Sequence, residues 1–297
     1  MFLLERRATA LLIITALIWG VGFVAQRAAM DFMGPFTYNA LRFGLGGLSL
    51  IPVVIVLEKG GVGWHTVKAG LIGGGVLFAA ATLQQIGIGI TGSAGKAGFI
   101  TGLYIVLVPI LGMFVGRRAS RYVWAGALLA VLGLYFISVP EGLSYIDLGV
   151  LLLIACAFGW AVHILVVDRF AAGIKPLGFS VVQCLVCSLL SLAAALTFED
   201  IHAADIVAGY IPLIYSAFVS VLIAYTLQIV GQKHVPPGRS AIIFSMESVV
   251  AAVAEAAILG VFLSGRGYFG GGLIFLGIVI ANSMRNSPDG AAPESAR

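Results

Sequence analysis

Charged residues are too scarce in this chain to cover the surface of a soluble protein. Asp, Glu, Lys and Arg make up 10% of the 297 residues, whereas 60% are hydrophobic and the mean hydropathy is +1.08. A soluble domain has about 25% charged residues. The composition excludes that class and predicts an all-α polytopic membrane protein, because helices satisfy their own backbone hydrogen bonds in lipid.

Motifs for catalysis and metal binding are also missing. No HExxH or GxSxG motif occurs, so neither a zinc hydrolase nor a serine hydrolase is supported. The Cys184-x-x-Cys187 pair has no second pair or flanking histidine to complete a zinc site. The 17 basic residues never form a run that would indicate nucleic-acid binding. We expect no cofactor, metal or nucleic-acid partner.

The stretch TGSAGKAGFITG, residues 91–102, looks like a phosphate-binding loop but lacks the required spacing. Ile90 and Ala97 stand where a Walker A motif needs Gly and Ser or Thr. Apolar runs precede and follow it, so we expect Lys96 near a membrane surface between two helices.

Apolar windows of about 20 residues predict ten transmembrane helices joined by short loops. The expected spans are residues 9–29, 36–57, 67–90, 94–115, 120–139, 146–168, 177–198, 206–231, 237–263 and 268–285. The polar tail 286–297 has nothing to bury and is expected to be disordered.

The basic residues predict the orientation of these spans. With the amino terminus in the cytoplasm, the inner loops and termini contain Arg6, Arg7, Lys59, Lys68, Arg117, Arg118, Arg121, Arg169, Lys175, Lys233, Arg239, Arg285 and Arg297. The outer loops contain only Arg27, Lys96 and Arg266, and Arg42 falls inside the second span. The positive-inside rule therefore predicts a multi-pass protein of the inner (plasma) membrane with both termini and the tail cytoplasmic.

The chain repeats itself. An offset of 143 residues aligns Gln85 with Gln228 and Lys96 with Arg239, and an offset of 141 aligns Trp19 with Trp160 and Arg42 with Gln183. The two halves, 9–139 and 146–285, have five spans each, and an odd number makes the second copy enter from the opposite face. Such inverted repeats are typical of transporters that alternate access around a midplane site.

Several stretches resemble one known family over nearly the whole chain. ALIWGVGFVAQR, ALRFGLGGLSL, LQQIGIGITGSAGKAGFI, AFGWAVHILVVDR and SMESVVAAV are similar to the EamA-type drug/metabolite transporter (DMT) superfamily. The resemblance implies ten transmembrane helices as two inverted five-helix EamA repeats. It also implies export of amino acids or other small metabolites, as in YddG-type amino acid exporters.

Polar groups inside membrane spans are costly, so each is a candidate for the substrate cavity. Glu247 lies near the middle of the ninth span, with Ser240 seven residues earlier on the same helix face. Its repeat partner is Tyr104, and we expect this pair to flank the centre of pseudo-symmetry. We hypothesise that Glu247 contacts the solute or takes up a proton during transport; a structural hydrogen bond is the alternative.

The remaining cavity candidates have equally plain structural alternatives. Gln84, Gln85 and Gln228 can bind a solute's charged groups or join helices, and Arg42 can pair with a carboxylate or reach the outer interface. Trp19, Trp160, Tyr38 and Tyr225 can line a cavity or simply pack. His163 is the last candidate.

His163 and Asp168 match the HxxxxD spacing of membrane acyltransferases, which makes an intramembrane enzyme an alternative function. Five residues rotate the chain by about 500° on a helix, which leaves the two side chains about 140° apart. A channel would need a ring of charge, and none is evident. We therefore predict a secondary carrier, not an enzyme, that exports small amphiphilic metabolites, with amino acids favoured over drugs or other metabolites. We expect a monomer whose partners are its solute and the bilayer.

The charge distribution yields a test of topology. Cysteines introduced in the loop 117–121 and at both termini should react only with reagents that reach the cytoplasm. Labelling of that loop from outside intact cells would contradict the predicted orientation.

Overall fold

The computed structural model describes residues 2–58, 61–117, 119–138, 147–170, 173–259 and 265–283, and these residues form helices without strands. The first half contains α1 (Phe2–Ala29), α2 (Pro35–Leu57), α3 (Trp64–Thr91), α4 (Ala94–Thr101), α5 (Tyr104–Phe114) and α6 (Arg121–Ser138). The second contains α7 (Leu148–Phe170), α8 (Pro176–Phe198), α9 (Ala203–Ala208), α10 (Tyr210–Ile214), the π-helix η1 (Tyr215–Tyr225), α11 (Thr226–Gln232), α12 (Pro237–Phe244), α13 (Met246–Leu259) and α14 (Gly265–Ser283). The expected tail 286–297 lies outside the described residues.

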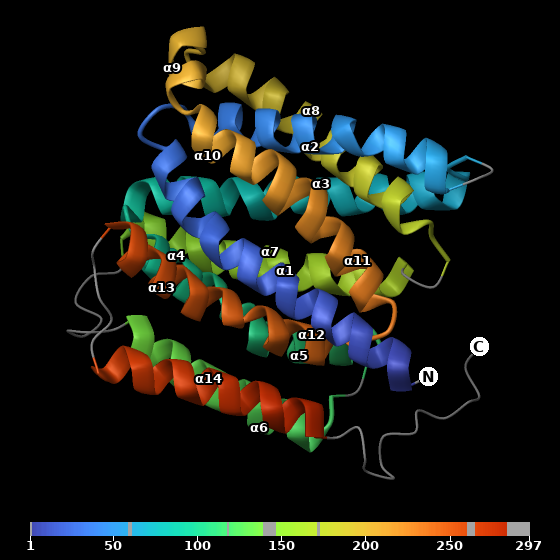
Figure 1. The fold of residues 1–297 in the computed structure, drawn as a ribbon, viewed down its shortest axis with the longest axis vertical. Coiled ribbons are helices and arrows are strands. Elements are labelled where there is room, and N and C mark those ends of the chain that lie inside the picture. Colours follow the sequence, from blue (N-terminus) through green and yellow to red (C-terminus); the bar gives the residue numbers. More distant parts are fainter. Residues whose placement is uncertain are drawn as a thin grey trace.

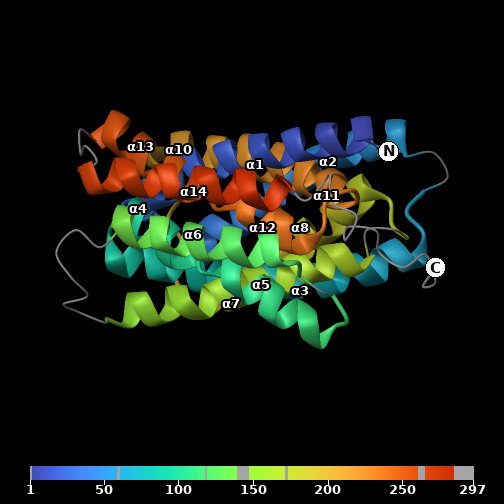
Figure 2. The same cartoon turned by 90° about the horizontal axis from the view of Figure 1, so that it is seen from below.

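The helices form a bundle whose members run roughly along one direction (Figures 1 and 2). Eight helical segments in the described part of the chain are long and apolar enough to cross a membrane, and α6 and α14 provide two shorter apolar helices. Figure 1 shows α2 packed on α8 at one edge of the bundle and α6 packed on α14 at the other, with the remaining long helices between them. The chain is therefore an all-helical, multi-pass membrane protein.

The stretch that looked like a phosphate-binding loop is the junction of two helices. Gly92 has a left-handed backbone conformation, φ 65°, that ends α3. The next residue, Ser93, caps α4, and its hydroxyl accepts a hydrogen bond from the backbone N–H of Lys96. A glycine followed by a capping serine is the usual chemistry for ending one helix and starting another.

Two spans predicted as continuous helices, 94–115 and 237–263, are interrupted near their middles. The first is split between α4 and α5 at Gly102 and Leu103, and the second between α12 and α13 at Ser245. Ser240 lies in α12 and Glu247 in α13, on the two sides of this break, so their shared helix face stays a prediction. The first break directly precedes Tyr104, and the second lies two residues before Glu247.

Glycines allow α6 and α14 to pack backbone against backbone. A Cβ atom on Gly133 would lie 2.4 Å from the carbonyl oxygen of Gly270, and one on Gly126 would lie 2.7 Å from that of Gly277. Small residues permit such close approach between helices in lipid, where apolar side chains gain little by leaving the hydrocarbon. By contrast, Gly116 ends α5 with φ 77° and has nothing near it, so it serves a turn rather than packing.

This seam makes Gly133→Ala a destabilising change. The new methyl group would collide with a backbone atom that cannot rotate away, and overpacking of this kind costs about 1–3 kcal/mol. Gly272→Ala, on the same pair of helices, meets nothing within 4 Å and is the control. Melting temperatures of the purified variants in detergent should fall for Gly133→Ala only; equal melting temperatures would show that the seam tolerates separation.

Candidate functional site

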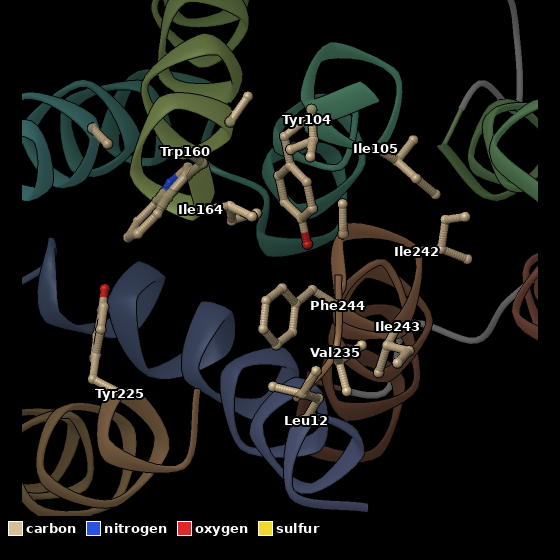
Figure 3. Packing of buried hydrophobic residues seen from close by; sticks show 14 of the residues in the cluster. Leu12, Tyr104, Ile105, Trp160, Ile164, Tyr225, Val235, Ile242, Ile243 and Phe244 are labelled. Carbon is tan, nitrogen blue, oxygen red and sulfur yellow. The ribbon is translucent and has the colours of Figure 1, made fainter. Parts of the chain in front are cut away.

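A central cavity lies between the two halves of the chain. Its walls contain Trp19, Phe23, Gln26, Arg42, Gln84, Thr101, Tyr104, Trp160, Ile164, Ser220, Tyr225, Gln228, Phe244 and Glu247, seven residues from each half. Figure 3 shows Tyr104, Trp160, Tyr225 and Phe244 directed toward this shared space from four different helices. A solute bound here would touch both halves at once.

Arg42 provides a buried cation in the cavity wall. Its side chain is held by a 2.9 Å hydrogen bond from Nε to Asn39 Oδ1, and its guanidinium lies 5.0 and 4.7 Å from the ring centres of Tyr38 and Phe43. The residue is 3% exposed, and no carboxylate pairs with it in the described part of the chain. A buried charge without a counter-ion is costly, so this side chain has strong capacity to bind an anion.

Glu247 provides the acidic group. Tyr104 Oη donates a 2.9 Å hydrogen bond to Glu247 Oε1, and no cation within the described ranges forms an ion pair with this carboxyl group. Glu247 is 4% exposed. The carboxyl group thus keeps capacity for a second donor.

Aromatic rings enclose the space between these groups. The Trp19 ring lies 6.3 Å from Trp160, 5.0 Å from Tyr225 and 5.4 Å from Phe244, all within the range of favourable ring contacts. The π-helix η1 supplies Tyr225 and Ser220 to the wall. Such π-helical segments are uncommon and concentrate at functional sites.

Two contacts in the cavity join equivalent positions of the sequence repeat. Tyr104 and Glu247, which share a hydrogen bond, are 143 residues apart, and the neighbouring Trp19 and Trp160 rings belong to residues 141 apart. Equivalent positions meet each other only at the boundary where the two copies face one another. The cavity therefore lies at that boundary.

Amide side chains add hydrogen-bonding capacity. Gln26, Gln84 and Gln228 line the cavity, and the side-chain oxygens of Gln26 and Gln228 are buried without a hydrogen-bond partner in the described structure. The indole N–H of Trp160 is likewise unpaired. Unpaired buried polar atoms are costly, so a polar solute or water would stabilise this arrangement.

Four of the predicted cavity residues lie outside the cavity wall. Gln85 Nε2 donates to the backbone carbonyl oxygen of Gln26, and the Tyr38 hydroxyl shares a hydrogen bond with that of Ser216. Ser240 Oγ donates to the Val235 carbonyl oxygen in the turn before α12, and His163 Nε2 pairs with Gln183 Oε1 at 3.0 Å. These contacts are the structural alternative that the sequence left open for such residues.

His163 and Asp168 do not share a site. His163 is buried against Gln183, whereas Asp168, near the end of α7, accepts a hydrogen bond from Arg117 Nε and forms an ion pair with the same guanidinium. The HxxxxD spacing thus serves two separate contacts and does not bring an acid and a base to one substrate.

Six lining residues were missed by the sequence reading: Phe23, Gln26, Thr101, Ile164, Ser220 and Phe244. Gln26 has the same signal as the other glutamines, an amide within an apolar span, and the rule for intramembrane polar groups finds it. Thr101 and Ser220 have no distinctive signal, because hydroxyls are common in membrane helices and bond to their own backbone.

The cavity is narrow as it stands. The space open to the centres of water molecules is about 30 Å³, enough for water but not for a metabolite. Binding a solute therefore requires the two halves, or the side chains between them, to move apart.

A polytopic helical protein with a polar, aromatic cavity between two sequence repeats has the construction of a membrane transporter. The EamA-like transporter family matches this chain twice, over residues 6–139 and 147–283. The chain belongs to that family and is an EamA-family transporter of a small-molecule substrate.

Similar proteins agree with the assignment. An uncharacterised transporter of Archaeoglobus fulgidus is 31% identical over 275 residues, which cover 91% of this chain and 84% of that protein. The threonine/homoserine exporter RhtA of Escherichia coli K12 is 32% identical over 184 residues, 59% of this chain and 57% of the exporter. A crystal structure that is 20% identical superposes with a TM-score of 0.77 and covers 94% of this chain and 97% of its own, which shows a shared fold.

The contact between Tyr104 and Glu247 yields a prediction about stability. Tyr104→Phe, Glu247→Leu and the double variant form a cycle in which each single change removes the hydrogen bond, so the bond should appear as a coupling of about 0.5–3 kcal/mol. Unfolding of the purified proteins in mixed detergent micelles measures it. Additive effects would mean that the hydroxyl and the carboxyl group act independently.

Proposed function

We propose that this transporter is a secondary carrier that exports small amphiphilic metabolites, amino acids first among them, by alternating access of the central cavity. The observation that carries the proposal is one cavity, lined equally by both halves, that contains a cation and a carboxyl group without ion-pair partners among the described residues. A free amino acid has the complementary pair of charges. We place the carrier in the inner membrane as a monomer with both termini cytoplasmic.

We propose that the protein has ten transmembrane helices. Besides the eight long segments, α6 has 18 residues and α14 has 19. At about 1.5 Å per residue, each is close to 27 Å long, comparable with the hydrocarbon thickness of a bilayer. Their packing on each other through glycines supports two further spans.

The packing of the helices supports inverted repeats with domains 9–139 and 146–285. The pairs α2 with α8 and α6 with α14 each join equivalent spans of the two halves, as expected for helices that flank a two-fold axis. The first and third spans pair in a symmetric way. The third span of the first half, α3, packs on the first span of the second half, α7, and the first span of the first half, α1, packs on η1 and α11 in the third span of the second half. The glycine contacts behave likewise, since Gly126 meets Gly277 and Gly133 meets Gly270.

Ion pairs at the two ends of the bundle support alternating access. Lys96 Nζ lies 3.7 Å from Asp147 Oδ2, beside the start of α7, and the equivalent cation, Arg239, lies 2.6 Å from Glu5 Oε1 in the first turn of α1. Figure 1 shows the starts of α4 and α1 at opposite ends of the bundle. Equivalent cations thus close opposite ends, as two gates of one carrier would.

The two ion pairs differ in strength. The Arg239 and Glu5 side chains are 10% and 18% exposed, whereas those of Lys96 and Asp147 are 37% and 38% exposed. Water screens the second pair more, and exposed pairs contribute little. We take the Arg239 end, which is cytoplasmic in the proposed orientation, as the more tightly closed gate in this conformation.

The choice of amino acids rests on the charges of the cavity and on the similarity to RhtA, whose name describes threonine and homoserine export. The YddG-type likeness stays a prediction. Export of drugs or other metabolites by the same fold is the alternative, and a transport assay with a broad panel separates the two.

Reconstituted liposomes test the function directly. The purified protein should move labelled amino acids across the bilayer when tested against a panel that includes organic cations, sugars and nucleosides. Transport only of solutes without an amino and a carboxyl group would overturn the amino acid assignment.

Glu247→Gln tests the role of the carboxyl group in the same liposomes. The variant keeps size and hydrogen bonding but cannot ionise, so it should fold and lose either about tenfold in apparent solute affinity or the pH dependence of transport. Glu255→Gln, in the same helix α13, is the control, because Glu255 accepts a hydrogen bond from the backbone of Gly95 away from the cavity wall. Identical curves for wild type and Glu247→Gln would remove Glu247 from the mechanism.

A further inference from the structure

The charges of the cavity come one from each half of the chain. Arg42 belongs to α2 in the first half, and Glu247 belongs to α13 in the second. At the equivalent positions the other half has Gln183 and Tyr104, neither of which is ionised at neutral pH. The two repeats have therefore diverged so that the wall contains one cation and one acid.

The two ionisable side chains of the wall do not pair with each other. No ion pair within 4 Å joins Arg42 and Glu247, although both line the same cavity. Rings of Trp19, Tyr225 and Phe244 also line it, and the Trp19 ring contacts both of the others. Separated opposite charges in a low-dielectric space match a solute that has both charges and spans the gap between them.

We infer that the cavity binds its solute in one orientation, with an α-carboxylate on the Arg42 guanidinium and the α-ammonium on Glu247 and the Tyr104 hydroxyl. This inference rests on the proposed amino acid function and assigns each end of the solute to one half of the carrier. The planar guanidinium suits a carboxylate because it can donate two parallel hydrogen bonds. Its orientation is set in advance by Asn39 and by the rings of Tyr38 and Phe43.

The orientation has a consequence for the transport cycle. A zwitterion that contacts Arg42 and Glu247 together links the two halves, so its binding energy favours conformations in which the cavity is wide enough to hold it and both halves still contact it. A solute with only one of the two charges contacts one half and lacks this link. Free amino acids should therefore be carried, and derivatives blocked at either end should be poor substrates.

Blocked analogues provide the test in liposomes that contain the full-length protein. L-Threonine is compared with threonine amide, which lacks the carboxylate, and with N-acetylthreonine, which lacks the ammonium group, as inhibitors of labelled threonine transport. If another amino acid is carried better, that amino acid and its two derivatives replace the threonine set. The wild type should prefer the free amino acid to either derivative by about tenfold or more.

Variants should lose these preferences in a crossed pattern. Arg42→Gln should bind the free amino acid and its amide within about threefold of each other while still rejecting the N-acetyl form. Glu247→Gln should bind the free amino acid and its N-acetyl form within about threefold of each other while still rejecting the amide. Arg42→Lys, which keeps the charge but changes the shape of the side chain, should still discriminate against the amide. It separates the loss of charge in Arg42→Gln from any disturbance of the fold by a substitution at this position.

Matched controls make the same chemical changes away from the cavity. Arg121→Gln and Glu255→Gln should keep both preferences. The assigned orientation would be overturned if each cavity variant lost its preference against both derivatives, or if each kept both preferences, even though amino acids are carried. A wild type that carries no amino acid would instead count against the proposed function.

Discussion

The structure depends on the absence of hydrogen-bonding partners in lipid. Backbone N–H and C=O groups must be paired inside each segment, which makes every described span a helix and confines irregular backbone to protected places. The breaks at Gly102 and Leu103 and at Ser245 lie within the packed bundle, and local contacts satisfy their polar groups. Ser248 Oγ, for example, donates to the Gly98 carbonyl oxygen, and Ser245 Oγ donates to that of Ile242. The same rule makes the unpaired amides of the cavity informative.

Close packing of small residues holds these helices together in the bundle. Helices in lipid gain stability from contact and shape rather than from expulsion of water, and glycine allows the shortest approach. The α6 and α14 pair uses glycine on both sides, and α1 meets the second half at Gly20, where a Cβ would lie 2.4 Å from Val250. These seams join the halves at one edge of the bundle and beside the central cavity, which polar and aromatic groups line.

Much of the candidate site follows from one rule applied to the sequence: ionisable and amide groups inside apolar spans are costly and need a reason. That rule selects Arg42, Glu247, Gln84 and Gln228, all of which line the cavity. It also selects Gln85 and His163, which the structure pairs with neighbouring helices. The rule cannot separate the two groups, because a hydrogen bond across helices and a solute contact satisfy the same amide. The internal repeat predicts that Tyr104 and Glu247 flank a common centre, and their hydrogen bond agrees with it.

Composition and hydropathy determined the class and the approximate spans, since these depend only on the amount and spacing of apolar residues along the chain. Matching residues at fixed offsets indicated two related halves. Tertiary structure decided which polar groups meet. Ser240 Oγ bonds to the Val235 carbonyl oxygen whereas Glu247 lines the cavity, and His163 on α7 bonds to Gln183 on α8 and does not share a site with Asp168. Such choices depend on side-chain directions across helices far apart in sequence, where a rotation of one helix by a single residue changes every partner. Local spacing contains no information about that rotation.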